Sequence, residues 1–330
     1  MPVYGIVRTL SWPPGPNEQL DVQGLWLAGL MELTVRARKI DLPATLTRAE
    51  GPVRAGVVVL HGAEAGARSY FLYEHLSAVL PAQGVAVLRF DRRPSTDGND
   101  IALEVQAQDA LAAARCLRDH IHEAPVGLWG FSQGAWAAPL AAVVDPGAVA
   151  FLVCVSACGV SPAEQMRIGA GKQLLKAGHA VGDVEELTQL RLEVEHYLRG
   201  KRDRATTQAM LDEAAARPWF AHAYLPPSLP DPGAWADMDF DPEPILARVS
   251  CPVLAFYGET DEWMPIEESI SAWRKAEGEG HPLDDLTVMR LDGTDHLPTF
   301  GGQPDPEAIS PLYTATLTGW INDRFGPTSS

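Results

Sequence analysis

The stretch 127–142, GLWGFSQGAWAAPLAA, contains a serine whose surroundings could make it a nucleophile. Ser132 lies between Gly130 and Gly134 in a G-x-S-x-G pattern, after an apolar run that predicts a strand and before an alanine-rich run that predicts a helix. A serine on so sharp a turn takes up strained backbone angles, and side chains at the glycine positions would collide with the strand and the helix. The alternative is a chance match in a glycine-rich chain, and the predicted strand and helix argue against it.

A general base and an orienting carboxylate must accompany a reactive serine, because a hydroxyl alone is a poor nucleophile. Both occur downstream, the acid first and the histidine second. Asp261 lies in the turn GETDEWMP after the predicted strand VLAFYG, and His296 lies in LDGTDHLP after the last predicted strand. The sequence therefore predicts that Ser132, Asp261 and His296 act together.

Three other carboxylates could replace Asp261. Asp295 is adjacent to His296, but neighbours on one loop rarely face each other well enough for an orienting hydrogen bond. Glu259 and Glu262 share the loop of Asp261 and remain the weaker alternatives.

Four other histidines have simpler interpretations than proton transfer. His281 lies in a polar loop that we expect to be solvated, and His61 belongs to a strand-end turn that it would brace. His120 and His122 end a predicted helix with no paired ligand pattern, so surface cations are expected there and not metal ligands.

The elements that must position these residues alternate between strand and helix. An antiparallel pair, MELTVRA and IDLPATLT, precedes the continuous apolar run AGVVVLHG, which is typical of a strand buried on both faces. The later strands, GVAVLRFDRR, PVGLWG, VAFLVCVSA, CPVLAFYG and LTVMRLDG, are separated by helical patterns. This alternation predicts an α/β fold with a doubly wound, mostly parallel sheet.

The segment between the serine and the acid is longer than one helix, one strand and two loops require. We expect an N-terminal extension at 1–30, a core at 31–161 and 247–330, and a helical cap at 162–246 over the active-site edge of the sheet. The cap residues expected to line an apolar substrate pocket are Met166, Trp219, Phe220, Tyr224 and Trp235. Each of these side chains could instead attach the cap to the sheet.

The chain resembles the α/β-hydrolase superfamily over about residues 31–325, through HG at 61–62, GFSQG, GETD and TDH at successive strand ends. It is most similar to serine esterases and acyl hydrolases with a helical insertion. The resemblance implies that Ser132 is the nucleophile, that His296 is general base and then general acid, and that Asp261 fixes the imidazole tautomer.

Two backbone N–H groups are expected to form the oxyanion hole. The helix after Ser132 directs its unpaired N–H groups toward the turn, which makes the N–H of Gln133 one donor. The resemblance implies a second donor at Ala63, after the HG pair. Glu64 departs from the family pattern there, and we expect its carboxylate to turn toward solvent or toward Arg68.

Composition excludes some partners. The 330 residues carry 43 acidic and 26 basic side chains, a formal charge of −17, which would repel nucleic acid and anionic membranes. The N-terminus lacks a secretory pattern and no apolar stretch is long enough for a membrane span, so a soluble cytoplasmic protein is expected. The four cysteines lack metal-site spacing and are expected to be buried thiols: Cys116, Cys154, Cys158 and Cys251.

The sequence predicts cleavage of small or medium carboxylic esters through an acyl-enzyme, with no cofactor and no metal. A peptidase or amidase ranks second, because the cap holds Glu185, Glu186, Glu193 and Glu195, although their spacing also suits a solvated helix face. An acyl-CoA thioesterase, carbon–carbon bond hydrolysis or perhydrolysis could run on the same residues, and a non-catalytic binding module is a further alternative. The oligomeric state, a homodimer included, is left open.

Overall fold

A computed structural model describes residues 29–63, 65–95, 100–277, 283 and 285–326. The expectations for residues 1–28, Glu64 and His281 lie outside these residues. The strands are β1 (Leu30–Ala37), β2 (Ile40–Thr47), β3 (Ala55–Leu60), β4 (Val85–Phe90), β5 (Val126–Phe131), β6 (Phe151–Val155), β7 (Val253–Gly258) and β8 (Leu286–Leu291). The helices are α2 (Phe71–Val79), α3 (Leu103–Ile121), α4 (Gly134–Val144), α5 (Pro162–Lys176), α6 (Val181–Leu198), α7 (Arg204–Ala214), α8 (Glu243–Leu246), α9 (Ile266–Ala276) and α10 (Pro311–Phe325). Short 3₁₀ turns occur at Pro81–Gln83, Pro218–His222 and Pro306–Ala308.

The eight strands form one sheet in the order β1-β2-β4-β3-β5-β6-β7-β8. β2 pairs antiparallel with β1 and β4, and the pairs from β4 to β8 are parallel. β3 and β5 are neighbours, yet the chain continues from β3 to β4 on one side and from β5 to β6 on the other. The connections that leave their carboxyl ends therefore run in opposite directions, and such a switch point is the usual place for a ligand in such sheets.

Both faces of the sheet are covered, which explains why its inner strands are apolar throughout. In β3, Val58 and Leu60 belong to a core cluster with α3, α4 and α9, whereas Val57 and Val59 belong to a second cluster with α2 and α10. The predicted doubly wound α/β fold is thereby confirmed.

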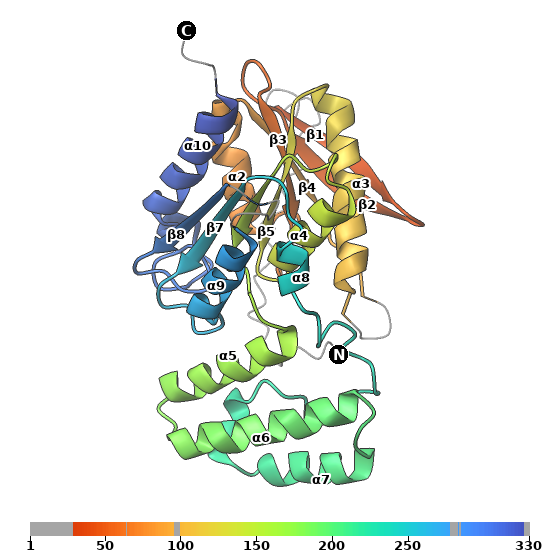
Figure 1. The fold of residues 1–330 in the computed structure, drawn as a ribbon, viewed down its shortest axis with the longest axis vertical. Coiled ribbons are helices and arrows are strands. Elements are labelled where there is room, and N and C mark those ends of the chain that lie inside the picture. Colours follow the sequence, from red (N-terminus) through yellow and green to blue (C-terminus); the bar gives the residue numbers. More distant parts are fainter. Residues whose placement is uncertain (1–28, 64, 96–99, 278–282, 284, 327–330) are drawn as a thin grey trace, which may run out of the picture.

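A separate helical layer is inserted between β6 and β7. Helices α5, α6 and α7 lie together beyond the end of the sheet where β6 leads into α5 (Figure 1). They share an apolar cluster of their own around Leu187, Val194 and Leu211. The chain then returns to the core, where α8 packs on α4 and α9.

No helix in the part of the chain that the structure describes has the length and apolarity to cross a bilayer.

Candidate active site

Ser132 occupies the tight turn between β5 and α4. Its φ angle is +53°, a strained value for a residue with a side chain. A Cβ on Gly130 would lie 2.3 Å from the carbonyl oxygen of Gly134, and one on Gly134 would lie 2.7 Å from that of Leu60. The two glycines are therefore needed for the strand, the turn and the helix to pack this closely.

Ser132, His296 and Asp261 are connected by hydrogen bonds. The Nε2 atom of His296 lies 2.9 Å from the Oγ atom of Ser132, and its Nδ1 atom lies 2.9 Å from Oδ2 of Asp261. The three residues follow β5, β8 and β7, whose parallel carboxyl ends meet at one edge of the sheet. The structure thus brings together the three side chains that the sequence singled out.

The Asp261 carboxylate is held in place from its other side. Its Oδ1 atom accepts hydrogen bonds from the backbone N–H groups of Trp263, at 2.8 Å, and Met264, at 3.2 Å. Its side chain is completely buried. These contacts leave Oδ2 directed at His296, which favours the tautomer with a proton on Nδ1 and a free electron pair on Nε2.

The environment of His296 favours its protonated form. Burial opposes the charge and lowers the pKa, but the charge and hydrogen bond of Asp261 and the charge of Asp295 outweigh it, so the pKa lies above the usual 6.5. The Oγ atom of Ser156 donates to the backbone carbonyl of His296 at 3.0 Å and fixes the loop. The imidazole can therefore accept the serine proton as a stabilised cation.

The three rival carboxylates have other partners. Asp295 accepts from the backbone N–H of Leu297 at 3.3 Å. Glu259 pairs with Arg290, and Glu262 with Lys176. None of the three is hydrogen-bonded to the His296 ring within the described residues.

The two expected oxyanion donors also lie at the switch point between β3 and β5. The backbone N–H of Gln133, where α4 begins, and that of Ala63, after β3, have no acceptor among the described residues. A helix N-terminus adds partial positive charge at Gln133. Both groups are thus available to a developing oxyanion.

Two buried rings brace the loop that carries Ala63. The hydroxyl of Tyr73 accepts from the N–H of Gly62 at 3.0 Å and donates to the carbonyl of Ala65 at 2.9 Å. The Nε2 atom of His61 lies 2.5 Å from the carbonyl oxygen of Phe90. Because burial lowers the pKa of His61 to about 4, its ring is neutral at pH 7, in keeping with the bracing role expected of it.

A further network joins the two oxyanion residues, and sequence reasoning missed it. Arg92 donates to the carbonyl oxygen of Ala63 at 2.8 Å and to Oδ1 of Asp100 at 2.6 Å. Oδ2 of Asp100 accepts from the side-chain amide of Gln133 at 2.5 Å. Only the arginine pair directly after a buried strand hinted at this role, since such positions face the active edge of the sheet.

The five expected pocket residues separate into two groups. Met166, Tyr224 and Trp235 line a cavity inside the helical layer. Trp219 is buried in the apolar cluster of that layer with its indole N–H donating to Glu186 at 3.2 Å, and Phe220 packs against the same cluster. The last two therefore hold the helical layer together and do not line the cavity.

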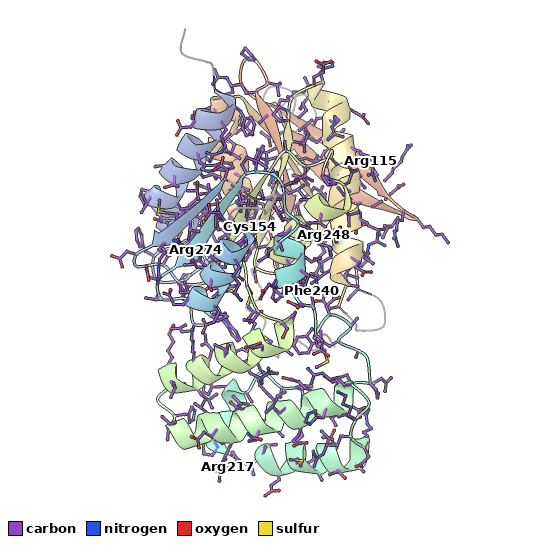
Figure 2. All side chains as sticks on the ribbon, in the orientation of Figure 1. Arg115, Cys154, Arg217, Phe240, Arg248 and Arg274 are labelled. Carbon is purple, nitrogen blue, oxygen red and sulfur yellow. The ribbon has the colours of Figure 1, made fainter. Side chains whose placement is uncertain are left out.

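The four cysteines are free thiols, and Cys116 is only partly buried, in contrast to the expectation that all four would be buried. Cys154, near the middle of the sheet in Figure 2, is fully buried, and burial raises its pKa well above the ordinary value. The described residues contain no cluster of histidine, cysteine and carboxylate side chains that could hold a metal ion.

The sequence profile of the alpha/beta hydrolase family matches residues 57–310. The chain belongs to this family, and membership supports hydrolase activity. No curated protein sequence matches the chain.

Solved structures share the fold at low sequence identity. The proline iminopeptidase of Mycobacterium smegmatis is 17% identical with a TM-score of 0.54, over 89% of this chain and 98% of that one. Est1E from Butyrivibrio proteoclasticus, solved with ferulic acid, is 15% identical with a TM-score of 0.57, over 89% and 100%. A carboxyl esterase from Bacillus coagulans, in complex with glycerol, is 15% identical with a TM-score of 0.56, over 89% and 98%. At these identities the likeness shows the fold alone.

Proposed function

We propose that the protein is a serine hydrolase that cleaves carboxylic esters of small or medium acyl compounds. The observation that carries the proposal is the hydrogen-bonded series from Ser132 through His296 to Asp261, with 2.9 Å at both contacts. Its members lie where the alpha/beta hydrolase fold presents reactive groups, at the carboxyl ends of parallel strands.

The reaction proceeds in two stages. The Oγ atom of Ser132 attacks the ester carbonyl while Nε2 of His296 takes the hydroxyl proton. The N–H groups of Gln133 and Ala63 stabilise the tetrahedral oxyanion, and the imidazolium returns its proton to the departing alcohol. Water then cleaves the acyl-enzyme in the same way, which regenerates the serine hydroxyl and releases the acid.

We further propose that the helical layer at 162–246 is a cap that selects the substrate. The cavity lined by Met166, Tyr224 and Trp235 has room for about one or two water-sized groups, so it would hold only the small apolar end of a substrate. The ring of Tyr224 packs edge-on against Trp263, two residues beyond Asp261, at 4.7 Å between centroids. This contact connects the cap to the loop of the catalytic acid.

The catalytic alternatives use the same serine. The cap glutamates give little support to a peptidase, because Glu186 is paired with Arg217, Glu193 with Arg202, and Glu195 with Arg167. Figure 2 shows Arg217 on the side of the helical layer that faces away from the sheet. An amidase, an acyl-CoA thioesterase and a non-catalytic binding module remain distinct outcomes of the two experiments that follow.

A fluorophosphonate probe tests the nucleophile directly. We expect one covalent adduct at Ser132, no adduct in Ser132→Ala, and normal labelling in Ser271→Ala, whose hydroxyl is exposed on α9. Absence of any adduct on the folded wild-type protein would favour a binding module.

A panel of substrates tests the reaction class. p-Nitrophenyl esters of graded chain length are compared with aminoacyl anilides and an acyl-CoA. We expect the highest kcat/KM with an ester, and turnover that is lost in Ser132→Ala. Faster cleavage of an anilide or of the acyl-CoA would replace the proposal with an amidase or a thioesterase.

A further inference from the structure

A second cavity lies beside the nucleophile, between the core and the helical layer. It is lined by Gln133 and Trp136 of the nucleophile turn and helix, by Trp235 and Asp237 of the returning segment, and by Asp100. It admits about one water-sized group. Gln133 directly follows Ser132 and carries one of the proposed oxyanion donors, so the cavity shares one residue with the proposed reaction site.

One wall of the cavity contains a buried acceptor without a partner. Gln133 is only 6% exposed, and its side-chain N–H₂ is assigned by its contact with the Asp100 carboxylate, which can only accept. The Oε1 atom of Gln133 has no hydrogen-bond partner among the described residues. A buried unpaired acceptor is costly, which suggests that a bound donor completes it.

The charges at the cavity leave one carboxylate without a cation. Asp100 forms an ion pair with Arg92, at 2.6 Å. Asp237 accepts one hydrogen bond, from the N–H of Leu103 at 2.7 Å, and has no ion pair within the described part of the chain. Burial raises its pKa, and the charges of Asp100 and Glu104 add to this effect. A positive group nearby would therefore stabilise the ionised carboxylate of Asp237.

Two tryptophan residues also line the cavity. The indole N–H of Trp136 donates to the carbonyl oxygen of Cys158 at 2.7 Å, which fixes the ring. Indole faces attract cations, and Trp136 and Trp235 both line the cavity. A small cation with several N–H donors therefore matches the cavity in charge, size and hydrogen bonding.

We propose that this cavity binds a primary ammonium group of the substrate, on Asp237, Asp100 and the Oε1 atom of Gln133. The inference rests on the proposed serine hydrolase activity and narrows its substrates to amine-bearing esters. An ammonium group has three N–H donors, which these three acceptors can satisfy. The amine belongs to the acyl part or to the alcohol part of the ester, and the experiment separates the two.

Matched substrate pairs measure the effect of the amine. L-alanine ethyl ester is compared with ethyl propionate, which lacks only the acyl amine. 3-Aminopropyl propionate is compared with propyl propionate, which lacks only the amine of the alcohol. We expect kcat/KM to be at least about tenfold higher for the amine-bearing member of one pair, the minimum effect of a charge-assisted hydrogen bond.

Two variants locate the site. In Asp237→Asn, the ratio of kcat/KM for the amine-bearing ester to kcat/KM for the amine-free ester should fall toward one. Glu213→Gln removes the same charge from an exposed residue of α7 that neither lines the cavity nor acts on the pKa of Asp237, and its ratio should equal that of the wild type. Should Asp237→Asn fail to fold, inhibition of the wild-type protein decides: propylammonium should bind at least about tenfold more tightly than propanol.

The outcomes distinguish the two proposals. If Ser132 is labelled and the amine-free esters are cleaved, but neither pair shows a preference, the ammonium site is wrong and the hydrolase stands. A preference that Asp237→Asn leaves intact would also overturn the site. If no ester is cleaved and no adduct forms at Ser132, both proposals are wrong.

Discussion

Replacing Asp261 by asparagine should stop proton transfer without disturbing the fold. In the native protein Oδ1 accepts from the N–H groups of Trp263 and Met264, and Oδ2 accepts from Nδ1 of His296. An asparagine has only one oxygen, and the two backbone donors will retain it. Its N–H₂ group then faces Nδ1, so the imidazole carries its proton on Nε2 and cannot accept one from Ser132.

The size of the effect follows from the cost of turning the amide around. Restoring the active tautomer would leave both backbone donors unpaired, at about 1–3 kcal/mol each, or about 2–6 kcal/mol in total. That range corresponds to a loss in kcat of roughly 30-fold to 10⁴-fold. Removal of the corresponding charge in well-studied triads costs about 10⁴-fold, which places the expectation at the upper end.

The assay is steady-state hydrolysis of a p-nitrophenyl ester, with the rate of fluorophosphonate labelling as a second readout. Asp295→Asn is the matched control, because Asp295 adjoins His296 but accepts from the backbone of Leu297. We expect that variant to retain kcat within about tenfold, whereas Asp261→Asn should fall far below it. A smaller loss for Asp261→Asn than for Asp295→Asn would refute the assignment of the acid.

Three further predictions concern pH and packing. Because Asp261 and Asp295 hold the pKa of His296 above 6.5, the rise of kcat/KM with pH should have its midpoint above pH 6.5. A midpoint below pH 6.5 would contradict the stabilisation of the His296 cation by these two carboxylates. Gly134→Ala should lower the free energy of urea unfolding by about 1–3 kcal/mol, because its Cβ would meet Leu60, whereas Gly182→Ala in α6, with nothing within 4 Å, should be neutral or stabilising. The folded-state pKa of His61, about 4, lies below the unfolded value of 6.5, so the unfolded chain binds the extra proton and stability should fall by about 3 kcal/mol as the pH drops from 6.5 to 4. In His61→Gln this part of the acid sensitivity should be absent from unfolding curves measured across that interval.

The sheet and its helices could be predicted because their sequence signals are local. Buried parallel strands are apolar on both faces, so AGVVVL and VLAFYG were recognisable without knowledge of their neighbours. The turn at Ser132 could be predicted for a similar reason, since a serine flanked by two glycines between a strand and a helix is typical of a nucleophile turn. The positions of Asp261 and His296 followed from the rule that parallel strands end at one edge.

The contacts around the oxyanion residues could not be predicted in this way. Arg92, Asp100 and Gln133 come from three separate segments, and nothing in their spacing indicates that one carboxylate joins the other two. The same applies to Tyr73, whose helix pattern predicts a buried ring but not a hydroxyl between Gly62 and Ala65. Such contacts depend on how loops pack together, and loop packing leaves no periodic pattern in the amino-acid sequence.

The residues of the helical layer show a different limit. Trp219 and Trp235 are both buried aromatic side chains of the inserted segment, at 2% and 8% exposure, and composition cannot distinguish them. Only the tertiary structure places Trp219 inside the helical cluster and Trp235 against two cavities. Sequence patterns therefore identified the candidate residues but could not show which of them line a cavity.

The single indole of Trp235 forms part of the wall of both the cavity in the helical layer and the cavity beside Gln133. A change in the position of this indole would therefore alter the shape of both compartments at once. A smaller residue at this position would enlarge both compartments, the one that contains the carboxylates of Asp100 and Asp237 and the more apolar one within the helical layer. One substitution there would thus change the space open to a bound molecule on both sides, with Ser132, Asp261 and His296 left in place.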